Sequence, residues 1–139
     1  MTGARRRARA LALQILYEVD TVGHELEKVA ACLLAKKGLS EENAAFTREL
    51  ASGVIQNKEN IDHHIKTFAP AWPIEHTAVV DRNILRVAIF EILFDNKVSL
   101  KVAINEAVEL AKLFGSDKSS KFVNGVLGSV STLAANGKS

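Results

Sequence analysis

Residues 75–94 read EHTAVVDRNILRVAIFEILF and form the most apolar stretch of the chain. Its apolar side chains fall on more than one face of a helix: Val80, Ile84, Leu85, Val87, Ala88, Ile89, Ile92 and Leu93. A helix that is apolar nearly all round is surrounded by other elements. The stretch therefore predicts a central helix that ends at Asp95-Asn96, with other helices packed around it.

The segment Pro70-Ala71-Trp72-Pro73 comes just before this central helix. Proline cannot continue a helix and disfavours helix in the residue before it. We therefore expect a single domain over residues 1–139 that is divided here into two helical subdomains, about 5–69 and 74–133. Trp72 is expected to lie as a wedge under the linker.

Amphipathic helices are predicted on both sides of the linker, because apolar residues recur there at a spacing of 3.6. No sustained alternation or Asn-Gly or Asp-Gly hairpin indicates strands. The predicted fold class is all-α, with about seven helices, and residues 134–139 are expected to be frayed. Besides the central helix, the predicted helices are 5–20, 24–36, about 41–57, about 59–68, 101–114 and about 119–133.

Length and composition exclude several classes of protein. A chain of 139 residues with 47% hydrophobic residues makes one domain with a substantial core. Its single cysteine, Cys32, cannot form an internal disulfide, which fits a cytoplasmic protein. The apolar sequence around Cys32 predicts a buried thiol. Charges interrupt every apolar run before the roughly 18 residues that a membrane span needs, and the N-terminus lacks a signal core.

No catalytic or metal-binding pattern is present. The four histidines show no metal-ligand spacing, and the chain has neither a P-loop nor a serine-elbow motif. Glu106 and Glu109 share a helix face, and nearby Lys112 explains them as helix-face ion pairing. We expect no enzymatic activity, no metal and no cofactor.

The net charge of +2 conceals an uneven distribution, with two basic ends around an acidic middle. Residues 1–10 carry +4, residues 11–111 carry −5 and residues 112–139 carry +3. The N-terminal charge is Arg5-Arg6-Arg7-Ala8-Arg9, which opposes the helix dipole at the start of a helix. Because the arginine fork suits phosphate, the run predicts nucleic-acid binding. A solvated basic tail is the alternative.

A second basic motif is Lys118-Ser119-Ser120-Lys121-Phe122-Val123-Asn124-Gly125. Lysines, an aromatic ring and an amide near a helix N-terminus are typical of single-stranded RNA binding. Phe122 also has the phase of the apolar face, so a core position remains open. Gly125 and Gly128 predict the close approach of another helix, since glycine inside a helix costs about 1 kcal/mol relative to alanine.

Four charged residues interrupt the central helix: Asp81, Arg82, Arg86 and Glu91. They are either partners in internal ion pairs or the polar rim of a protein–protein interface. The sequence pattern leaves both interpretations open.

Four segments together closely resemble the NusB family of bacterial transcription antitermination factors. They are RRRARALALQILY (5–17), RVAIFE (86–91), KVAINEAVELAK (101–112) and KFVNGVL (121–127). The matches fall in the family's order and span about residues 5–133. The resemblance implies an all-α fold of two helical bundles.

The resemblance also implies a function and partners. NusB proteins pair with NusE, a ribosomal small-subunit protein, and bind boxA single-stranded RNA in nascent ribosomal RNA transcripts. The complex joins elongating RNA polymerase and suppresses premature termination without catalysis; it also assists assembly of the ribosomal small subunit. One alternative is an RNA-binding accessory of an rRNA methyltransferase, and another is a homodimer that covers the arginine motif.

The resemblance implies two sets of site residues. The RNA-binding set is Arg5, Arg6, Arg7, Arg9, Lys118, Lys121, Phe122 and Asn124. The NusE-interface set is Asp81, Arg82, Arg86 and Glu91. Some family members carry an acid at the position of Lys118, whereas here the acid is Asp117.

Overall fold

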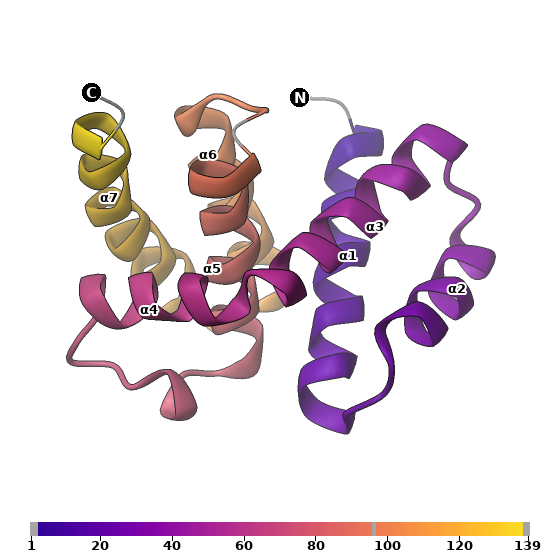
Figure 1. The fold of residues 1–139 in the computed structure, drawn as a ribbon, viewed down its shortest axis with the longest axis horizontal. Helices are drawn as coiled ribbons and strands as arrows, with labels where there is room; N and C mark the ends of the chain where they lie inside the picture. Colours follow the sequence, from indigo (N-terminus) through magenta and orange to yellow (C-terminus); the bar gives the residue numbers. More distant parts are fainter. Residues whose placement is uncertain (1–2, 96, 138–139) are drawn as a thin grey trace.

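The computed structural model describes residues 3–95 and 97–137, and within these ranges the chain is helical without any strand (Figure 1). This confirms the all-α prediction. The α-helices are α1 (Gly3–Val22), α2 (Leu26–Lys37), α3 (Glu41–Gln56), α4 (Lys58–Phe68), α5 (Val79–Ile89), α6 (Leu100–Phe114) and α7 (Ser119–Gly137). A 3-10 turn, η1 (Ile74–His76), precedes α5, and a π-helical turn, η2 (Phe90–Asp95), follows it.

The helix at the centre of the molecule is α5, as its apolar sequence predicts. It contacts α1, α3, α4, α6 and α7, and every residue from Asn83 to Ile89 is buried. It is shorter than the predicted 75–94, because Thr77 takes an extended conformation between η1 and α5. At the other end the helix widens into η2. There the Phe90 ring packs so closely on α3 that a Cβ on Gly53 would overlap it.

Figure 1 shows α1, α2 and α3 on one side of the molecule and α4 to α7 on the other. One continuous apolar cluster connects the two sides, because α1 packs against both α3 and α5. Serine side chains cap two of the helices: Ser40 Oγ accepts from the Asn43 amide at the start of α3, and Ser99 Oγ accepts from the Val102 amide at the start of α6. The subdomain boundary at Pro70–Pro73 stays a prediction.

Two residues predicted to be buried are exposed. Trp72 is 61% exposed, and the linker buries Ala69 and Ile74 instead, so the predicted wedge is wrong. Cys32 is also exposed. The buried residues of α2 are Val29 and Ala30; Cys32 is one turn after Val29 but nearly opposite Ala30, so it lies outside the buried face.

Two predictions about α7 are also wrong. The helix continues to Gly137, beyond the predicted end at residue 133, and residues 138–139 lie outside the described residues. Among the described residues no helix packs closely on Gly125 or Gly128, because a Cβ at either position would meet none of their atoms within 4 Å. None of the helices in the described part combines the length and hydropathy needed to span a bilayer.

Candidate nucleic-acid interface

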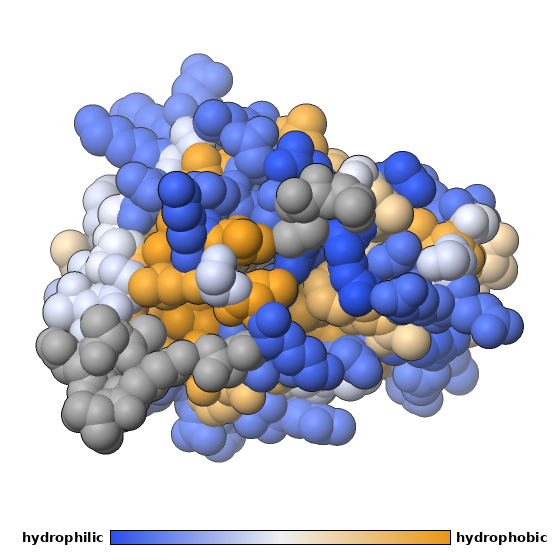
Figure 2. All heavy atoms as spheres, turned by 90° about the horizontal axis from the view of Figure 1, so that it is seen from above, coloured by the Kyte–Doolittle hydropathy of each residue, from blue (hydrophilic) through white to orange (hydrophobic). Residues whose placement is uncertain are grey.

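The arginine motif lies in the first two turns of α1, at the edge of the molecule where both termini are found (Figure 1). Figure 2 looks onto this edge and shows mainly hydrophilic side chains around a smaller hydrophobic area. Although the four arginines are consecutive or nearly so, a helix turns their side chains to different surroundings. The four arginines therefore differ in burial and in the residues that they contact.

Arg9 is buried, with only 1% of its surface exposed. Its Nε and Nη2 atoms donate to the two carboxylate oxygens of Glu91, each at 2.9 Å, and its Nη1 lies 3.9 Å from Glu106. This bidentate pair joins α1 to the π-helical turn η2. The contact of Arg9 with RNA stays a prediction, and the enclosure of its guanidinium in the protein argues against it.

Arg6 is partly exposed and at the same time forms an ion pair within the protein. Its Nε and Nη2 atoms donate to the carboxylate of Glu106 at 3.1 and 2.8 Å, while its side chain remains 44% exposed. The hydrogen bonds from Arg6 hold the pKa of Glu106 below its ordinary value against the opposing effect of burial, and the charges of Arg6 and Arg9 add to them. Arg6 can still meet a phosphate with its outer face.

Glu106 was not predicted to take part in this site. The predicted helix-face pairing is confirmed for Glu109, which lies 3.3 Å from Lys112, whereas Glu106 binds Arg6 on another helix. A signal was nevertheless present in the sequence, because Glu106 shares the buried face of α6 with Ala103, Ala107 and Leu110. A carboxylate on the buried face of a helix needs a cation from another helix.

The remaining two arginines are more accessible. Arg5 lies 4.0 Å above the Phe46 ring, donates to the Asn43 side chain at 3.1 Å and is 3.6 Å from Glu42. Arg7 is exposed, and within the described ranges it makes no ion pair. The accessible part of the arginine motif therefore consists of Arg7 together with the outer faces of Arg5 and Arg6.

The predicted protein interface on α5 is largely an internal ion-pair network. Arg82 binds both carboxylate oxygens of Asp20 at 2.8 and 2.9 Å, and Arg86 binds those of Asp62 at 2.8 and 3.0 Å. Arg86 also donates to Asp20 at 3.0 Å. Arg86 and Glu91 are both buried, which favours the internal ion-pair interpretation for these two residues, and their assignment to a NusE interface stays a prediction.

Asp20 is the centre of this network and was not predicted. Burial alone would raise the pKa of its carboxyl, but hydrogen bonds from Arg82 and Asn83, with the charges of Arg86 and Arg82, hold the pKa well below its ordinary range. The network ties the end of α1 to α5, and through Asp62 to α4. Ion pairs thus link the helices on the two sides of Figure 1.

The second predicted motif forms the start of α7, and its polar side chains are exposed. Lys118, Lys121 and Asn124 lie at the surface. Neither lysine has an ion-pair partner in residues 3–95 and 97–137. Ser119 is buried, and its Oγ accepts from the Ser116 amide at 2.8 Å, which closes the turn before α7. The two cations are therefore available to a ligand.

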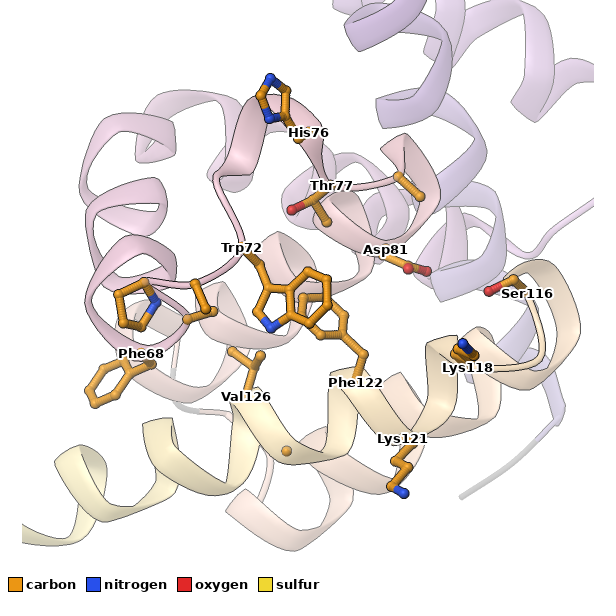
Figure 3. Close-up of a pocket in the computed structure, with 15 residues that line it drawn as sticks. Phe68, Trp72, His76, Thr77, Asp81, Ser116, Lys118, Lys121, Phe122 and Val126 are labelled. Atoms are coloured by element: carbon orange, nitrogen blue, oxygen red, sulfur yellow. The ribbon is translucent and has the colours of Figure 1, made fainter.

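Phe122 satisfies both interpretations in part, since one side packs against the core and the other lines a pocket. Its ring meets the exposed Trp72 ring edge to face, at 5.8 Å between centroids (Figure 3). The pocket has a volume of about 760 Å³ and lies between the Pro70–Pro73 linker, the first turn of α5 and the start of α7. Sequence reasoning found Phe122 but missed the pocket, because Trp72 and Phe122 are distant in the chain.

Asp81 is at the wall of this pocket. It is 9% exposed, and its buried Oδ1 atom has no hydrogen-bond partner within the described residues. Asp81 thus differs from the other three charged residues of the central helix, all of which are in ion pairs. Among the described residues, no group of three or more His, Cys, Asp or Glu side chains could hold a metal ion.

Comparison with known proteins gives a consistent result. The model of the NusB family matches residues 6–132. The chain is 51% identical to the transcription antitermination protein NusB of Dehalococcoides mccartyi (strain 195), over 97% of this chain and 94% of that protein. Solved structures agree in fold. The NusB of T. maritima superposes with a TM-score of 0.87 at 32% identity, over 95% of this chain and 93% of that one.

A further solved structure contains the antitermination factors NusB and NusE in complex with double-stranded RNA. Its matching chain superposes with a TM-score of 0.87 at 26% identity, and the match covers 95% of this chain and 98% of that one.

Proposed function

The chain belongs to the NusB family, and we propose that it is a transcription antitermination factor that binds boxA RNA together with NusE. The protein then acts without catalysis, in the cytoplasm, on RNA polymerase that is transcribing ribosomal RNA. A relative of 51% identity over nearly the whole chain is an antitermination protein. A structural neighbour of 26% identity is found with NusE and double-stranded RNA.

The observation that carries the proposal is the exposed basic start of α7 beside an aromatic pocket, with two lysines that have no ion-pair partner among the described residues. Single-stranded RNA is held by cations at its phosphates and by aromatic rings against its bases. Lys118 and Lys121 supply the cations, Phe122 supplies a ring, and Asn124 supplies an exposed amide. These elements lie together on one helix end.

The accessible arginines extend the proposed RNA surface. In Figure 1, α1 begins and α7 ends at the edge with the termini, so α7 begins at the opposite edge. A helix of 19 residues is about 28 Å long. RNA that touches both Arg7 and Lys121 therefore has to run along the molecule. We assign Arg5, Arg6 and Arg7 to phosphate contacts, and Arg9 to holding the helix that presents them.

Fewer residues of the central helix are accessible to NusE than the sequence suggests. Arg86 and Glu91 are enclosed in ion pairs, so we propose that they maintain the shape of α5. Arg82 is partly exposed, its Nη1 donates to the Ile74 carbonyl at 3.3 Å, and the charge of the exposed Glu75 acts on it. We propose that NusE contacts this edge, where the acidic middle of the chain suits a basic ribosomal protein.

Fluorescence anisotropy tests the proposal directly. A labelled boxA RNA and a scrambled RNA of equal length are titrated with the protein, alone and with NusE, at several salt concentrations. We expect selective binding of boxA RNA that NusE strengthens. A steep salt dependence for both RNAs with no effect of NusE would show only non-specific attraction to basic residues and would contradict the proposal.

Sedimentation velocity of the same samples tests the proposed homodimer. If a second copy covers the arginine motif, RNA and self-association compete, and the dimer dissociates as boxA RNA is added. A sedimentation coefficient that corresponds to a monomer at all concentrations would rule out this form of self-inhibition.

A further inference from the structure

The pocket at the start of α7 has a chemistry that a general RNA surface does not require (Figure 3). Its volume of about 760 Å³ falls in the range of small-molecule sites. Most of its wall is apolar or aromatic, with Phe68, Pro70, Trp72, Phe122 and Val126. The wall also includes the carboxylate of Asp81, which is 9% exposed and has a buried oxygen without a hydrogen-bond partner in the described residues.

An unpartnered carboxylate in an apolar wall requires a hydrogen-bond donor, because a buried acceptor without a partner costs free energy. Figure 3 places Asp81 toward the Ser116–Lys118 end of the pocket. Lys118 and Lys121 are among the residues that line it, and both are exposed. The pocket therefore offers an acceptor inside and positive charge at its rim.

These features select among possible occupants. A basic peptide would satisfy Asp81 but would be repelled by the two lysines, and an acidic peptide would be attracted by the lysines but repelled by Asp81. A nucleotide of an RNA strand has the required combination. Its base is flat and carries N–H donors, and its phosphates are anionic.

We propose that this pocket receives one unstacked base of the bound RNA and that Asp81 determines which base is accepted. The base stacks on the exposed face of Trp72 and contacts Phe122 with its edge, its donor groups face the Asp81 carboxylate, and the flanking phosphates lie near Lys118 and Lys121. Because Trp72 is 61% exposed, a base can cover its free face without separating it from Phe122. This inference rests on the proposed RNA-binding function.

The chemistry of the bases then predicts an order of preference. A carboxylate only accepts hydrogen bonds when ionised. Guanine presents two adjacent donors, N1–H and the 2-amino group, whereas adenine and cytosine present one amino group. Uracil presents a single N3–H between two carbonyl oxygens that would face the carboxylate. We expect guanine to bind best and uracil worst.

The test uses single-stranded oligouridine of one length, either unmodified or with a single guanosine, adenosine or cytidine, and full-length protein with NusE. Fluorescence anisotropy gives the affinity for each RNA. We expect the guanosine-containing RNA to bind about fivefold tighter or more than oligouridine, the lower limit for one bidentate contact to a base. Asp81→Asn should bring this ratio close to one while RNA binding itself persists.

Asp117→Asn is the matched control. It removes the same charge from an exposed position next to Lys118 that does not line the pocket. The preference for guanosine should survive in this variant, which separates a direct contact from a general change in charge. Thermal unfolding of both variants confirms that each is folded.

A second pair of variants blocks the pocket. Gly125 and Gly128 are both exposed on α7, and a Cβ on either meets nothing within 4 Å, but only Gly125 lines the pocket. Gly125→Leu should remove the preference for guanosine, and Gly128→Leu should retain it.

The outcomes that would overturn the inference are distinct from failure of the proposed function. Equal affinity of the wild-type protein for all four RNAs, or a preference unchanged in Asp81→Asn, would overturn the base pocket and leave RNA binding intact. Loss of NusE binding in Asp81→Asn with an unchanged base preference would identify Asp81 as a protein contact instead. No binding of any RNA, boxA included, would contradict the proposed function itself.

Discussion

The starts of α1 and α7 both carry basic residues of the predicted RNA-binding set, yet the structure uses their charges differently. At the start of α1, Arg9 is enclosed by Glu91 and Arg6 is held by Glu106. At the start of α7, Lys118 and Lys121 are exposed beside an aromatic pocket. At the start of α1 much of the charge forms ion pairs that join helices, whereas at the start of α7 the charge is exposed to solvent. A basic run in a sequence is therefore not by itself a measure of ligand-binding surface.

Helical phase explains which arginines are enclosed. Arg9 precedes the buried Leu13 by four residues and the buried Leu16 by seven, so it lies on the inner face of α1. Arg7 precedes the exposed Gln14 by seven residues and lies on the outer face. This distinction can be made from the sequence alone, although the prediction treated the motif as one unit.

The largest expected effect tests whether Arg9 is structural. Arg9→Met leaves Glu91 buried without its cation and should destabilise the protein by about 3–5 kcal/mol. Lys121→Met should change stability by less than about 0.5 kcal/mol, because Lys121 is exposed. Urea unfolding followed by circular dichroism measures both.

The double variant Arg9→Met with Glu91→Leu is the control for this experiment. It replaces the whole buried pair by apolar side chains and should regain most of the lost stability. If Arg9→Met changed the free energy of unfolding as little as Lys121→Met, the proposed contrast between the two basic regions would be wrong.

The second expected effect is a loss of stability at low pH. We expect it to arise from the ion pairs that join α1, α4 and α5 and not from residues of α7. The pKa of Asp20 is held well below its ordinary value in the folded protein. The folded state therefore binds this proton less readily than the unfolded state, so the contribution of Asp20 is complete above its unfolded pKa of about 4 and is lost as the pH falls below it.

Asp20→Asn removes that contribution. The variant should be less stable than the wild type by about 1–3 kcal/mol at pH 7, and the difference should shrink as the pH is lowered below about 4. Urea unfolding between pH 7 and pH 2.5 provides the comparison, with exposed Asp117→Asn as the control. A deficit that stays constant across this range would show that Asp20 acts by packing and not by its charge.

The fold was largely predictable because it depends on local patterns. The apolar residues of α5 recur on all faces and correctly indicate a central helix, and the apolar phase of the other helices follows from their spacing. The candidate site was less predictable because its contacts join distant residues. Glu106 meets an arginine 100 residues away, and Trp72 in the linker meets Phe122 on α7. No local pattern specifies such a pairing.

Asp81 illustrates the same limit on a single helix. Its three charged neighbours in the central helix find partners on other elements, and Asp81 does not share in those ion pairs. Sequence reasoning grouped all four together because their side chains are alike in charge and close in the chain. Only the position of the linker and α7 shows that Asp81 faces a pocket.

The third expected effect separates the accessible part of the arginine motif from the enclosed part. Arg7→Ala should lower the slope of log affinity against log salt by about 1, which reduces the gain in affinity between 200 and 50 mM salt by about fourfold. Its stability should change little, because Arg7 is exposed. Anisotropy titrations with boxA and scrambled RNA should show equal losses, since a phosphate contact carries no base information. A loss confined to boxA RNA would instead indicate that Arg7 reads a base.

The smallest expected effect concerns the helix that presents the second region. Gly128 lies within α7, is exposed and has open space where a Cβ would be, so Gly128→Ala should stabilise the protein by about 0.5 kcal/mol through helix propensity. RNA affinity should not change, because Gly128 does not line the pocket. If thermal unfolding showed the gain in stability together with weaker RNA binding, then the RNA surface would extend along α7 past the pocket. The contrast between an ion-paired α1 and a ligand-binding α7 would then apply to most of the helix and not to its first turns alone.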